Sequence, residues 1–451
     1  MTKKKRTILF IVCAVLFILI TPSVIFYSQG YRFDFETKKV VQTGGFYFKV
    51  FPRNAEIYLN GKLKTKTSVL TSSTLIKNLL PKTYEIQIKK EGYHSWQKSL
   101  EIYEKQVTEA KNIILFPENP KFETLTKNVN NFWFSPDGKK IAIYELNYPP
   151  LATTSPSRID KEPSPEWTLK LYELEKNIKS HLIGAKDIYS GGVDLLNLEF
   201  SQDSKEIYLN VGMKEQEKNF VLELNKFPPV LIKKETTSPP EDVITSQTFD
   251  NKIYYLDDSG YVFKADSLPL SLQERVGVKI NEKSFPIQQE TNYKLKILPD
   301  DYVFLQEKED LYLFNPSSKS FEKFFDGILD LKISPDLKKL AFFSKSEVWI
   351  LFLKDNLEQP IKKAGERVFL TRLSEKIGNV FWLNSNYLIF SSGSKIKIAE
   401  IDDRDKINIV DLAEFKEIKD AGQPEIFFNQ SDENLYVLSN EILYSSSPLL
   451  P

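Results

Sequence analysis

Aspartate recurs at one position of a repeated pattern, and these carboxylates are the first candidates for chemistry. Asp137, Asp203 and Asp336 each stand two residues after a serine and shortly before a lysine. Carboxylates at equivalent positions could bind a cation or a ligand. An aspartate in a tight turn also accepts hydrogen bonds from backbone N–H groups of that turn. We favour the turn role, because each aspartate lies between two apolar runs that predict strands.

Two denser acidic groups are candidate calcium ligands: Asp257-Asp258, and the Asp-Asp-Arg-Asp order at residues 402–405. Neither has the spacing of a calcium loop, which combines alternating oxygen ligands with a glycine and a distal glutamate. We therefore predict solvated turns at both. A carboxylate pair for glycoside hydrolysis can come from distant parts of a chain. With 61 acidic residues such pairs arise by chance, so this alternative stays open without named residues.

The residues on which most catalytic and metal sites depend are scarce. The sequence has two histidines, His94 and His181, and one cysteine, Cys13, which lies in an apolar N-terminal run. Zinc sites, thiolate sites and serine triads draw on these residue types. The 17 glycines form no Gly-x-Ser-x-Gly elbow and no phosphate-binding loop. We predict no catalytic residue, no cofactor and no metal, and packing or surface roles for the histidines.

The expanded connection at residues 146–166 is the most individual feature of the chain. Its prolines alternate with serine and threonine, a composition typical of exposed loops. Loops on a rigid scaffold often carry recognition, so this loop is the candidate binding site; a tolerated insertion is the alternative. Its candidate residues are Pro149, Pro150, Pro156, Arg158, Pro163 and Pro165.

The elements that position these residues are predicted to be strands. Aromatic residues make up 13% of the chain, and they favour pleated, half-buried surfaces. Pairs of apolar strands recur at roughly 40–50 residues, the period of a four-stranded propeller blade. The seven pairs predict about seven blades over residues 118–451. The first strands begin near Ile141, Ile207, Ile253, Tyr302, Leu340, Tyr387 and Leu435, and their partners near Trp167, Phe220, Tyr261, Leu311, Val348, Ile396 and Ile442.

Three segments align without gaps and carry a more specific resemblance. They begin at Phe132, Leu198 and Leu331, and they share an apolar strand, Ser-x-Asp, a lysine and a second apolar strand. The Ser-Pro-Asp-Gly order at residues 135–138 fits a type I turn. These copies resemble the blades of Tol-B-like propellers, which are relatives of WD-repeat propellers. The resemblance implies an architecture and no particular activity.

The ends of the propeller region predict how the ring closes. After residues 442–444 the chain lacks one strand of a full last blade. Residues 122–126, just before the first repeat, form a short segment that can supply it. Joining the ends in this way would bury a sheet edge that is otherwise exposed.

A smaller strand-rich module occupies residues 44–117. A turn at residues 52–55, the hairpin signal Asn60-Gly61 and a turn at Gly92-Tyr93 separate its alternating segments. The orders P-x-x-A-E-I-Y-L-N-G, L-L-P-x-x-Y-E-I-x-I and K-x-E-G-Y-x-x-W resemble a PEGA domain, a small β-sandwich of bacterial surface proteins. The turn that names the family is Pro-Arg-Asn-Ala here, and Lys82 replaces a later glycine of the family pattern. The resemblance implies a structural or adhesive spacer without catalytic residues.

The N-terminal region predicts a membrane anchor. Residues 1–6 carry three lysines and an arginine, and no charged residue follows until after Gln29. About 20 apolar residues cross a hydrocarbon core of about 30 Å, so residues 7–27 are predicted to be a transmembrane helix. An extended linker or strand is predicted at residues 28–43. The positive-inside rule places residues 1–6 in the cytoplasm and everything after Gln29 outside. A cleaved signal peptide is the alternative.

Charge and architecture together bound the function. Lys plus Arg equals Asp plus Glu, 61 each, so no basic excess predicts nucleic-acid binding. We expect an all-β, single-pass protein of the plasma membrane whose propeller binds a protein or glycan of the cell envelope without catalysis. A propeller hydrolase of envelope glycan or peptide, and a structural subunit of an envelope complex, are the alternatives. A sensory receptor is least expected, because residues 1–6 leave no domain on the cytoplasmic side.

Overall fold

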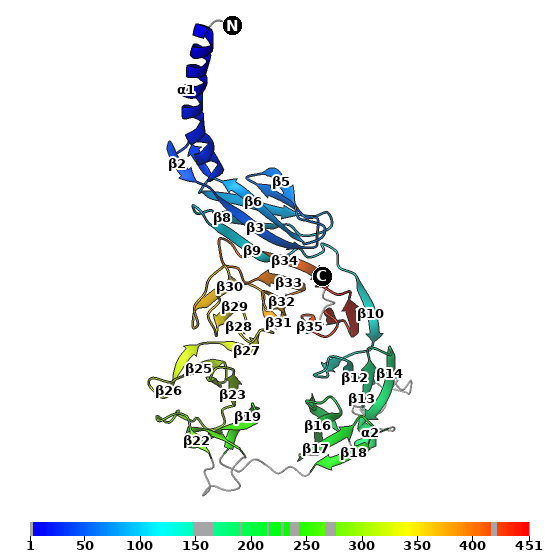
Figure 1. The fold of residues 1–451 in the computed structure, drawn as a ribbon. Helices are drawn as coiled ribbons and strands as arrows, with labels where there is room; N and C mark the ends of the chain where they lie inside the picture. Colours follow the sequence, from blue (N-terminus) through cyan, green and yellow to red (C-terminus); the bar gives the residue numbers. More distant parts are fainter. Residues whose placement is uncertain are drawn as a thin grey trace.

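The computed structural model describes residues 3–147, 166–189, 192–213, 216–226, 230–234, 243–266, 277–415 and 422–450. The chain runs from a long helix through a hairpin and a β-sandwich into a ring of seven four-stranded sheets (Figure 1). The all-β architecture predicted from the sequence is therefore confirmed, with one helix at the N-terminus.

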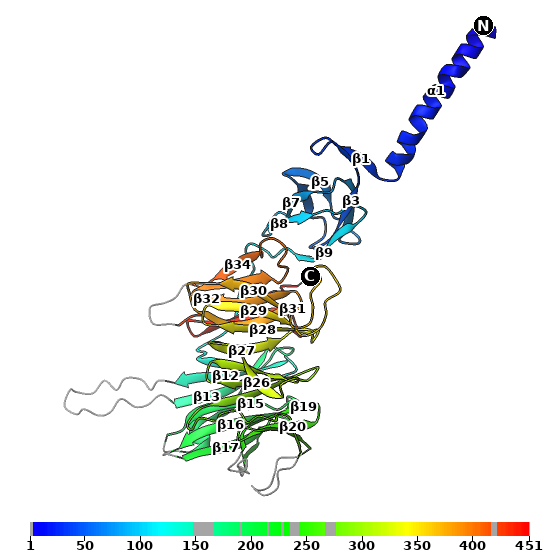
Figure 2. The ribbon, with the colours of Figure 1, turned by 90° about the vertical axis from the view of Figure 1, so that its left-hand side faces the viewer.

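Helix α1 (Lys3–Ser28) contains the apolar N-terminal run and projects away from the rest of the molecule (Figures 1 and 2). None of its residues is buried. Its length and composition are sufficient to cross a membrane, as predicted for residues 7–27. The helix begins earlier than that segment because lysine and arginine are good helix formers.

The segment predicted as an extended linker or strand folds back on itself. Strands β1 (Tyr31–Asp34) and β2 (Lys39–Gln42) pair antiparallel as a hairpin. Asp34 closes the turn by accepting hydrogen bonds from the Thr37 hydroxyl at 2.6 Å and the Glu36 N–H at 3.0 Å. These bonds lower the pKa of the Asp34 carboxyl, the Thr37 bond most. An aspartate at a turn start therefore converts the expected linker into a small ordered unit.

The sandwich consists of two sheets that enclose one hydrophobic core. Asn60 and Gly61 have φ values of 49° and 75°, so the predicted Asn-Gly turn joins β4 and β5. One sheet has the order β6-β3-β9 and the other β5-β4-β7-β8. The strands are β3 (Gly44–Phe51), β4 (Glu56–Leu59), β5 (Lys62–Lys66), β6 (Ser73–Leu79), β7 (Thr83–Lys89), β8 (Trp96–Glu101) and β9 (Val107–Ile114). Inward-facing residues of both sheets form the core, among them Phe46, Phe48, Ile57, Ile86 and Leu100.

The seven remaining sheets are the blades of a propeller, numbered here in chain order. Blade 1 has β11 (Asn131–Phe134), β12 (Lys140–Asn147), β13 (Glu166–Glu173) and β14 (Ile178–Gly184), followed by the short helix α2 (Ala185–Ile188). Blade 2 has β15 (Asp194–Phe200), β16 (Glu206–Met213), β17 (Gln216–Glu223) and β18 (Val230–Lys234). Blade 3 has β19 (Val243–Phe249), β20 (Lys252–Asp257), β21 (Val262–Ala265) and β22 (Val278–Lys279). Blade 4 has β23 (Tyr293–Leu298), β24 (Tyr302–Glu307), β25 (Asp310–Asn315) and β26 (Ser320–Phe325).

The later blades follow the same order. Blade 5 has β27 (Ile328–Ile333), β28 (Lys339–Ser344), β29 (Glu347–Phe352) and β30 (Arg367–Arg372). Blade 6 has β31 (Ile377–Asn384), β32 (Tyr387–Ser392), β33 (Lys395–Glu400) and β34 (Ile409–Glu414). Blade 7 has β35 (Glu425–Asn429), β36 (Asn434–Ser439), β37 (Ile442–Ser446) and, from the other end of the region, β10 (Phe122–Lys127). The strand pairs predicted from the sequence are the second and third strands of the seven blades.

Ring closure occurs in blade 7, as predicted. Strand β10 pairs antiparallel with β37, so that Phe122 lies opposite Ser446 and Thr124 opposite Tyr444. Segments more than three hundred positions apart in the sequence thus complete one sheet. The pairing covers the edge of β37 that would otherwise be unpaired.

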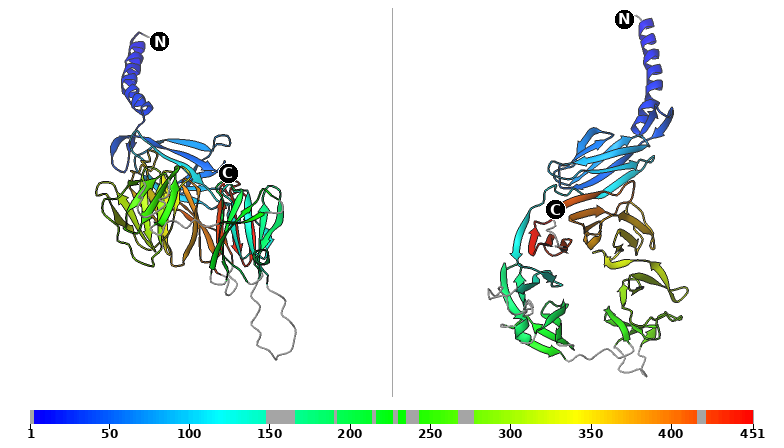
Figure 3. Two further views of the ribbon diagram at one scale, coloured as in Figure 1. Left: turned by 90° about the horizontal axis from the view of Figure 1, so that it is seen from below. Right: turned by 180° about the vertical axis from the view of Figure 1, so that it is seen from behind.

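Hydrophobic clusters join six of the seven neighbouring blade pairs among the described residues. None of these clusters spans blades 2 and 3. At that seam a small cluster with Tyr255 and Phe263 belongs to blade 3 alone, and Leu196 and Ile232 of blade 2 are exposed. Views along the ring axis show these two blades as the most widely separated neighbours (Figures 1 and 3). This seam is the least consolidated part of the ring.

Strand topology defines two faces of the ring. Consecutive strands of a blade are antiparallel, so alternate connections leave on opposite faces. The turn face carries the connections between first and second strands, which include the Ser-x-Asp turns, and between third and fourth strands. The loop face carries the connections between second and third strands and between successive blades. Figure 2 shows the ring from its edge, with the sandwich against its rim.

Candidate functional site

The predicted binding loop connects the second and third strands of blade 1. Strand β12 extends to Asn147 and β13 begins at Glu166, and these two residues pair with each other. The connection therefore starts and ends on the loop face. It spans residues 148–165, two residues fewer at the start and one fewer at the end than the predicted range 146–166. Its candidate residues Pro149, Pro150, Pro156, Arg158, Pro163 and Pro165 lie outside the described residues.

The repeated aspartates occupy turns. In all three copies the serine hydroxyl donates to the aspartate at 2.6–2.7 Å. The backbone N–H two residues after the aspartate donates to it at 3.0–3.2 Å. Partial burial of Asp137 and Asp336 acts to raise their pKa. The hydrogen bonds to Asp137, and those from the Lys339 ammonium and Ser334 to Asp336, outweigh burial and lower the pKa of both carboxyls. The bonds from Ser201 and the Lys205 N–H lower the pKa of Asp203. The predicted turn role is confirmed.

Asp257 also belongs to a turn, because its Oδ1 accepts a hydrogen bond from the Tyr261 N–H at 2.7 Å. Its side chain is buried, so the prediction of a solvated turn is wrong for Asp257, whereas Asp258 is exposed as predicted. His181 is exposed, and its Nε2 lies 3.7 Å from an Asp187 oxygen. The described part of the chain has no group of three or more His, Cys, Asp or Glu side chains that could hold a metal ion.

The acidic segment 402–405 corrects a prediction, since it is a docking loop rather than a solvated turn. It joins β33 to β34 of blade 6 and contacts strand β8 of the sandwich. Asp405 accepts a hydrogen bond from the Ser99 N–H at 2.7 Å. Arg404 pairs with Asp402 through two nitrogens, and its third donates to the Glu109 carbonyl at 2.9 Å. The segment therefore fixes the sandwich to the rim of the propeller on its turn-face side.

A buried ion pair lies at the centre of this interface. Lys98 of β8 is 0% exposed and Glu400 of β33 is 5% exposed, and their side chains meet at 2.7 Å. The Lys98 ammonium also donates to the carbonyls of Asp402 and Lys406, at 2.7 and 2.5 Å. All three donor sites of the ammonium are thus used, which a buried charge requires if it is not to destabilise the fold.

Glu400 is equally satisfied. Its second oxygen accepts a hydrogen bond from the Trp96 indole N–H at 2.7 Å, and Asn408 donates to the first oxygen from its side chain at 2.7 Å and its backbone at 3.1 Å. Burial raises the pKa of the Glu400 carboxyl, while Lys98 and Trp96 favour its charged form. The carboxylate is surrounded by fixed donors, which is the arrangement of a structural ion pair.

Tyrosine and aromatic packing extend the interface toward blade 7. The Tyr387 hydroxyl accepts a hydrogen bond from the Ile114 N–H at 3.0 Å, and its ring meets Phe116 edge-on at 5.4 Å. Complete burial raises the pKa of Tyr387 well above its usual value. His94 lines a small cavity with these rings, and its Nε2 is buried without a hydrogen-bond partner among the described residues. This placement agrees with the packing role predicted for His94.

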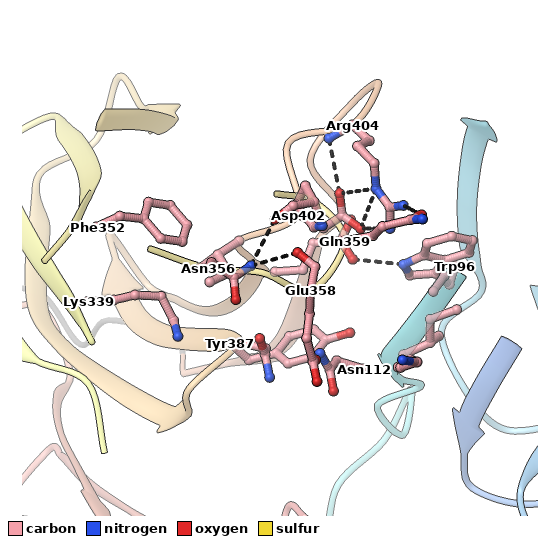
Figure 4. Close-up of a pocket in the computed structure, with 17 residues that line it drawn as sticks. Trp96, Asn112, Lys339, Phe352, Asn356, Glu358, Gln359, Tyr387, Asp402 and Arg404 are labelled. Atoms are coloured by element: carbon pink, nitrogen blue, oxygen red, sulfur yellow. Dashed lines mark hydrogen bonds and ion pairs between the residues drawn. The ribbon is translucent and has the colours of Figure 1, made fainter. Parts of the chain in front are cut away.

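A small cavity of about 60 Å³, partly open to solvent, lies beside the ion pair. Figure 4 shows Trp96 and Asn112 of the sandwich on one side, and Asn356, Gln359 and Tyr387 of the propeller facing them. Glu400 and Asp402, two of the carboxylates that line the cavity, are each paired with a cation. These contacts hold the two domains in one orientation. Because Glu400 and Asp402 are both paired with cations, neither is placed to act as a general acid or base.

Sequence reasoning missed this site, although one signal was present. In β8 the side chains of Trp96, Lys98 and Leu100 point to the same side, because strand side chains alternate. A lysine in phase with two buried apolar residues indicates a buried charge that needs a partner from elsewhere. The partner, Glu400, lies too far along the chain for the sequence to identify it.

Comparison with protein families identifies the sandwich. Residues 50–114 match the PEGA domain. This agrees with the resemblance seen at residues 44–117, and the name PEGA domain is used below for β3–β9. None of the curated proteins compared with the chain matches it.

Comparison with solved structures gives distant likenesses, each with a TM-score below 0.5. YCF48 from Cyanidioschyzon merolae has 9% identity and a TM-score of 0.43, covering 72% of this chain and 99% of that one. YCF48 bound to D1 peptide has 10% identity and a TM-score of 0.41, covering 73% and 96%. A chain of the mitotic checkpoint complex has 9% identity and a TM-score of 0.43, covering 74% and 92%. Likenesses at this level say nothing about partners or activity.

Proposed function

We propose that the protein is a non-catalytic display protein: α1 anchors it in the plasma membrane, and the propeller binds a protein or glycan of the cell envelope. The PEGA domain holds the propeller away from the bilayer. N-terminal lysines would keep residues 1–6 in the cytoplasm and place the remainder outside.

The observation that carries this proposal is the buried ion pair between Lys98 of the PEGA domain and Glu400 of the propeller. Two domains joined by a flexible linker would not need a buried ion pair between them. A buried ion pair keeps its hydrogen-bond partners in only one relative orientation of the two domains. Because α1 and the PEGA domain lie at one end of the molecule and blades 2 to 4 at the other (Figure 1), a fixed geometry presents the propeller in a defined direction. Such presentation suits recognition of a partner.

Loop lengths indicate which face of the propeller recognises the partner. The PEGA domain contacts the rim of the propeller on its turn-face side, through 402–405 and the β29–β30 connection. On the loop face, blades 4 to 7 join their second and third strands by two-residue turns, at 308–309, 345–346, 393–394 and 440–441. The same connection in blade 1 spans residues 148–165. We therefore assign binding to the loop face around blade 1.

The test replaces residues 148–165 with Asn-Gly, the two-residue turn that suits a hairpin. Asn147 and Glu166 already pair, so the ladder of blade 1 is preserved. Full-length protein and this variant are crosslinked in intact envelopes and recovered with whatever they hold. We expect the variant to lose its dominant partner by about tenfold or more, equivalent to about 1.4 kcal/mol.

Its control is a two-residue change on the turn face far from the PEGA domain, Asp203→Ala with Lys205→Ala, which leaves the loop face intact. Equal partner recovery by the wild type and by both variants would contradict the assignment to blade 1. Absence of any partner or envelope glycan with the wild type would contradict the binding function itself.

A further inference from the structure

The hairpin β1–β2 has one apolar face that nothing in the described structure covers. Phe33 lies directly opposite Val40 in the register, so both point to the same side. The Phe35 ring, in the turn, meets the Phe33 ring edge-on at 5.1 Å. The side chain of Phe33 is 48% exposed, that of Val40 63% and that of Phe35 84%. Such a cluster at the end of a small hairpin is an unfavourable surface to leave in water.

This face continues the apolar surface of α1. Tyr31, on the same side of β1 as Phe33, meets Phe26 of the helix edge-on at 5.4 Å. On the opposite side of the hairpin, the Arg32 guanidinium lies 3.5 Å from the centre of the Tyr27 ring and donates to the Tyr27 carbonyl at 2.7 Å. The hairpin is therefore held against the helix end in a defined orientation, and it extends sideways from that end (Figure 2).

Polar contacts hold the hairpin to the domain on the other side. The Glu36 carboxylate pairs with Lys82 of the PEGA domain at 3.0 Å, and the Lys105 N–H of that domain donates to the Thr43 carbonyl at 3.4 Å. The Thr43 hydroxyl closes the base of the hairpin by donating to the Gly30 carbonyl at 2.9 Å. A two-stranded hairpin alone is marginally stable in water and needs a surface to pack on. Its polar contacts face the protein, whereas no residue that the structure describes buries its three exposed apolar side chains.

We propose that the Phe33, Phe35 and Val40 face lies in the headgroup region of the lipid bilayer, beside the outer end of α1. Aromatic residues concentrate at that depth because one part of the ring is buried and its edge stays near water. Lys38 and Lys39 at the turn are exposed and can extend toward lipid phosphates. The inference rests on the membrane anchoring proposed above and adds a second point of contact to it.

A second contact changes what the anchor can do. A single helix leaves the attached domains free to rotate about the helix axis. A hairpin that is fixed to the helix end and also seated in the interface would stop that rotation. The propeller would then keep one orientation relative to the membrane, in addition to the fixed orientation that Lys98 and Glu400 impose between domains.

The experiment uses full-length protein in liposomes of neutral and anionic phospholipid, in a Cys13→Ser background. Single cysteines carry an environment-sensitive fluorophore in three variants, Phe35→Cys, Phe17→Cys and Val278→Cys. Position 17 reports insertion of α1, and position 278, 72% exposed in blade 3, reports the far end of the molecule. Quenching is measured with lipids that carry a nitroxide near the headgroup, with lipids that carry it deep in the acyl chain, where position 17 lies, and, separately, with aqueous iodide.

We expect lipid quenching at position 35 to exceed that at position 278 several-fold, with protection from iodide. Quenching at 35 no greater than at 278, while position 17 is quenched by lipid, would overturn the inference and leave the anchor intact. Protection from iodide at 35 without lipid quenching would also overturn it and assign the face to a second copy of the chain. Loss of lipid quenching at position 17 would overturn the membrane anchor itself.

Discussion

At the scale of single residues, the chain shows how burial turns an ordinary side chain into a structural one. Lys98 and Glu400 are unremarkable in the sequence, yet they form the most buried ion pair between the two domains. Each of their hydrogen-bonding atoms has a partner. Removing one member of a buried pair leaves an uncompensated charge and costs about 3–5 kcal/mol.

We predict that Lys98→Met lowers the free energy of unfolding by about this amount, about 3–5 kcal/mol, because Glu400 loses its cation inside the interface. The measurement is a urea titration of the detergent-solubilised protein. The matched control is Lys139→Met, whose pair with Glu175 is 57% and 70% exposed and should matter by less than about 1 kcal/mol. Similar effects of the two substitutions would mean that the interface pair contributes little.

Backbone strain at a turn gives a second residue-scale prediction. Leu337 stands where Gly138 stands in the first Ser-x-Asp copy, and both have positive φ, 55° and 67°. Positive φ costs a residue with a Cβ about 1–2 kcal/mol. We predict that Leu337→Gly raises the free energy of unfolding by about 0.5–1 kcal/mol, the remainder being offset by the greater entropy of glycine in the unfolded chain.

The control for that change is Leu357→Gly. Leu357 is 79% exposed and is not among the residues with positive φ, so glycine should only destabilise there. Calorimetric unfolding of both variants compares them directly. An equal loss of stability in the two would contradict the strain argument.

At the scale of elements, the closing strand decides whether the ring is a continuous sheet system. Strand β10 brings Glu123 opposite Ser445 of β37. Opposed residues in antiparallel strands have Cα atoms about 4.5–5.5 Å apart, within the range of a disulfide. Phe122 of β10 also contacts Phe415, which follows β34 of blade 6, with the two rings 5.2 Å apart.

We predict that Glu123→Cys with Ser445→Cys, in a Cys13→Ser background, forms a disulfide under mild oxidation, seen as a mobility shift on a non-reducing gel. Thr124→Cys with Ser445→Cys is the control, because Thr124 points to the opposite face and pairs with Tyr444. Crosslinking of the control as efficient as that of the paired variant would show that the register of β10 differs from the one described.

At the scale of the whole molecule, stability is distributed unevenly around the ring. Blade 6 shares hydrophobic clusters with both neighbouring blades and contacts the PEGA domain. Blades 2 and 3 each share a cluster with only one neighbour among the described residues. In arrays of repeated units, stability depends on the interfaces between neighbours.

We therefore predict that backbone amides in blades 2 and 3 exchange with deuterium about tenfold or more faster than those in blade 6, a difference of about 1.4 kcal/mol in opening free energy. Hydrogen exchange followed by mass spectrometry measures this blade by blade. Uniform protection around the ring would mean that the seam between blades 2 and 3 is as well packed as the others.

The sequence alone determined the local and periodic features of this protein. Strand periodicity, the Asn60-Gly61 turn and the Ser-x-Asp turns depend on residues close together in the chain, so their patterns are readable without a structure. The spacing of strand pairs then implied seven blades, and the missing last strand implied closure by residues 122–126. The apolar run of α1 could also be recognised from the sequence, because a helix that crosses a bilayer needs about 20 apolar residues.

Only the tertiary structure decided which distant residues meet. Lys98 and Glu400 come from different domains, so no local pattern joins them, and the segment 402–405 looks like any exposed acidic turn until β8 lies against it. The hairpin at 31–42 depends on how Asp34 closes a turn, and its apolar face matters because Tyr31 packs on Phe26 at the helix end. Local preference specifies elements, whereas burial of charge and apolar surface between elements specifies how they are assembled.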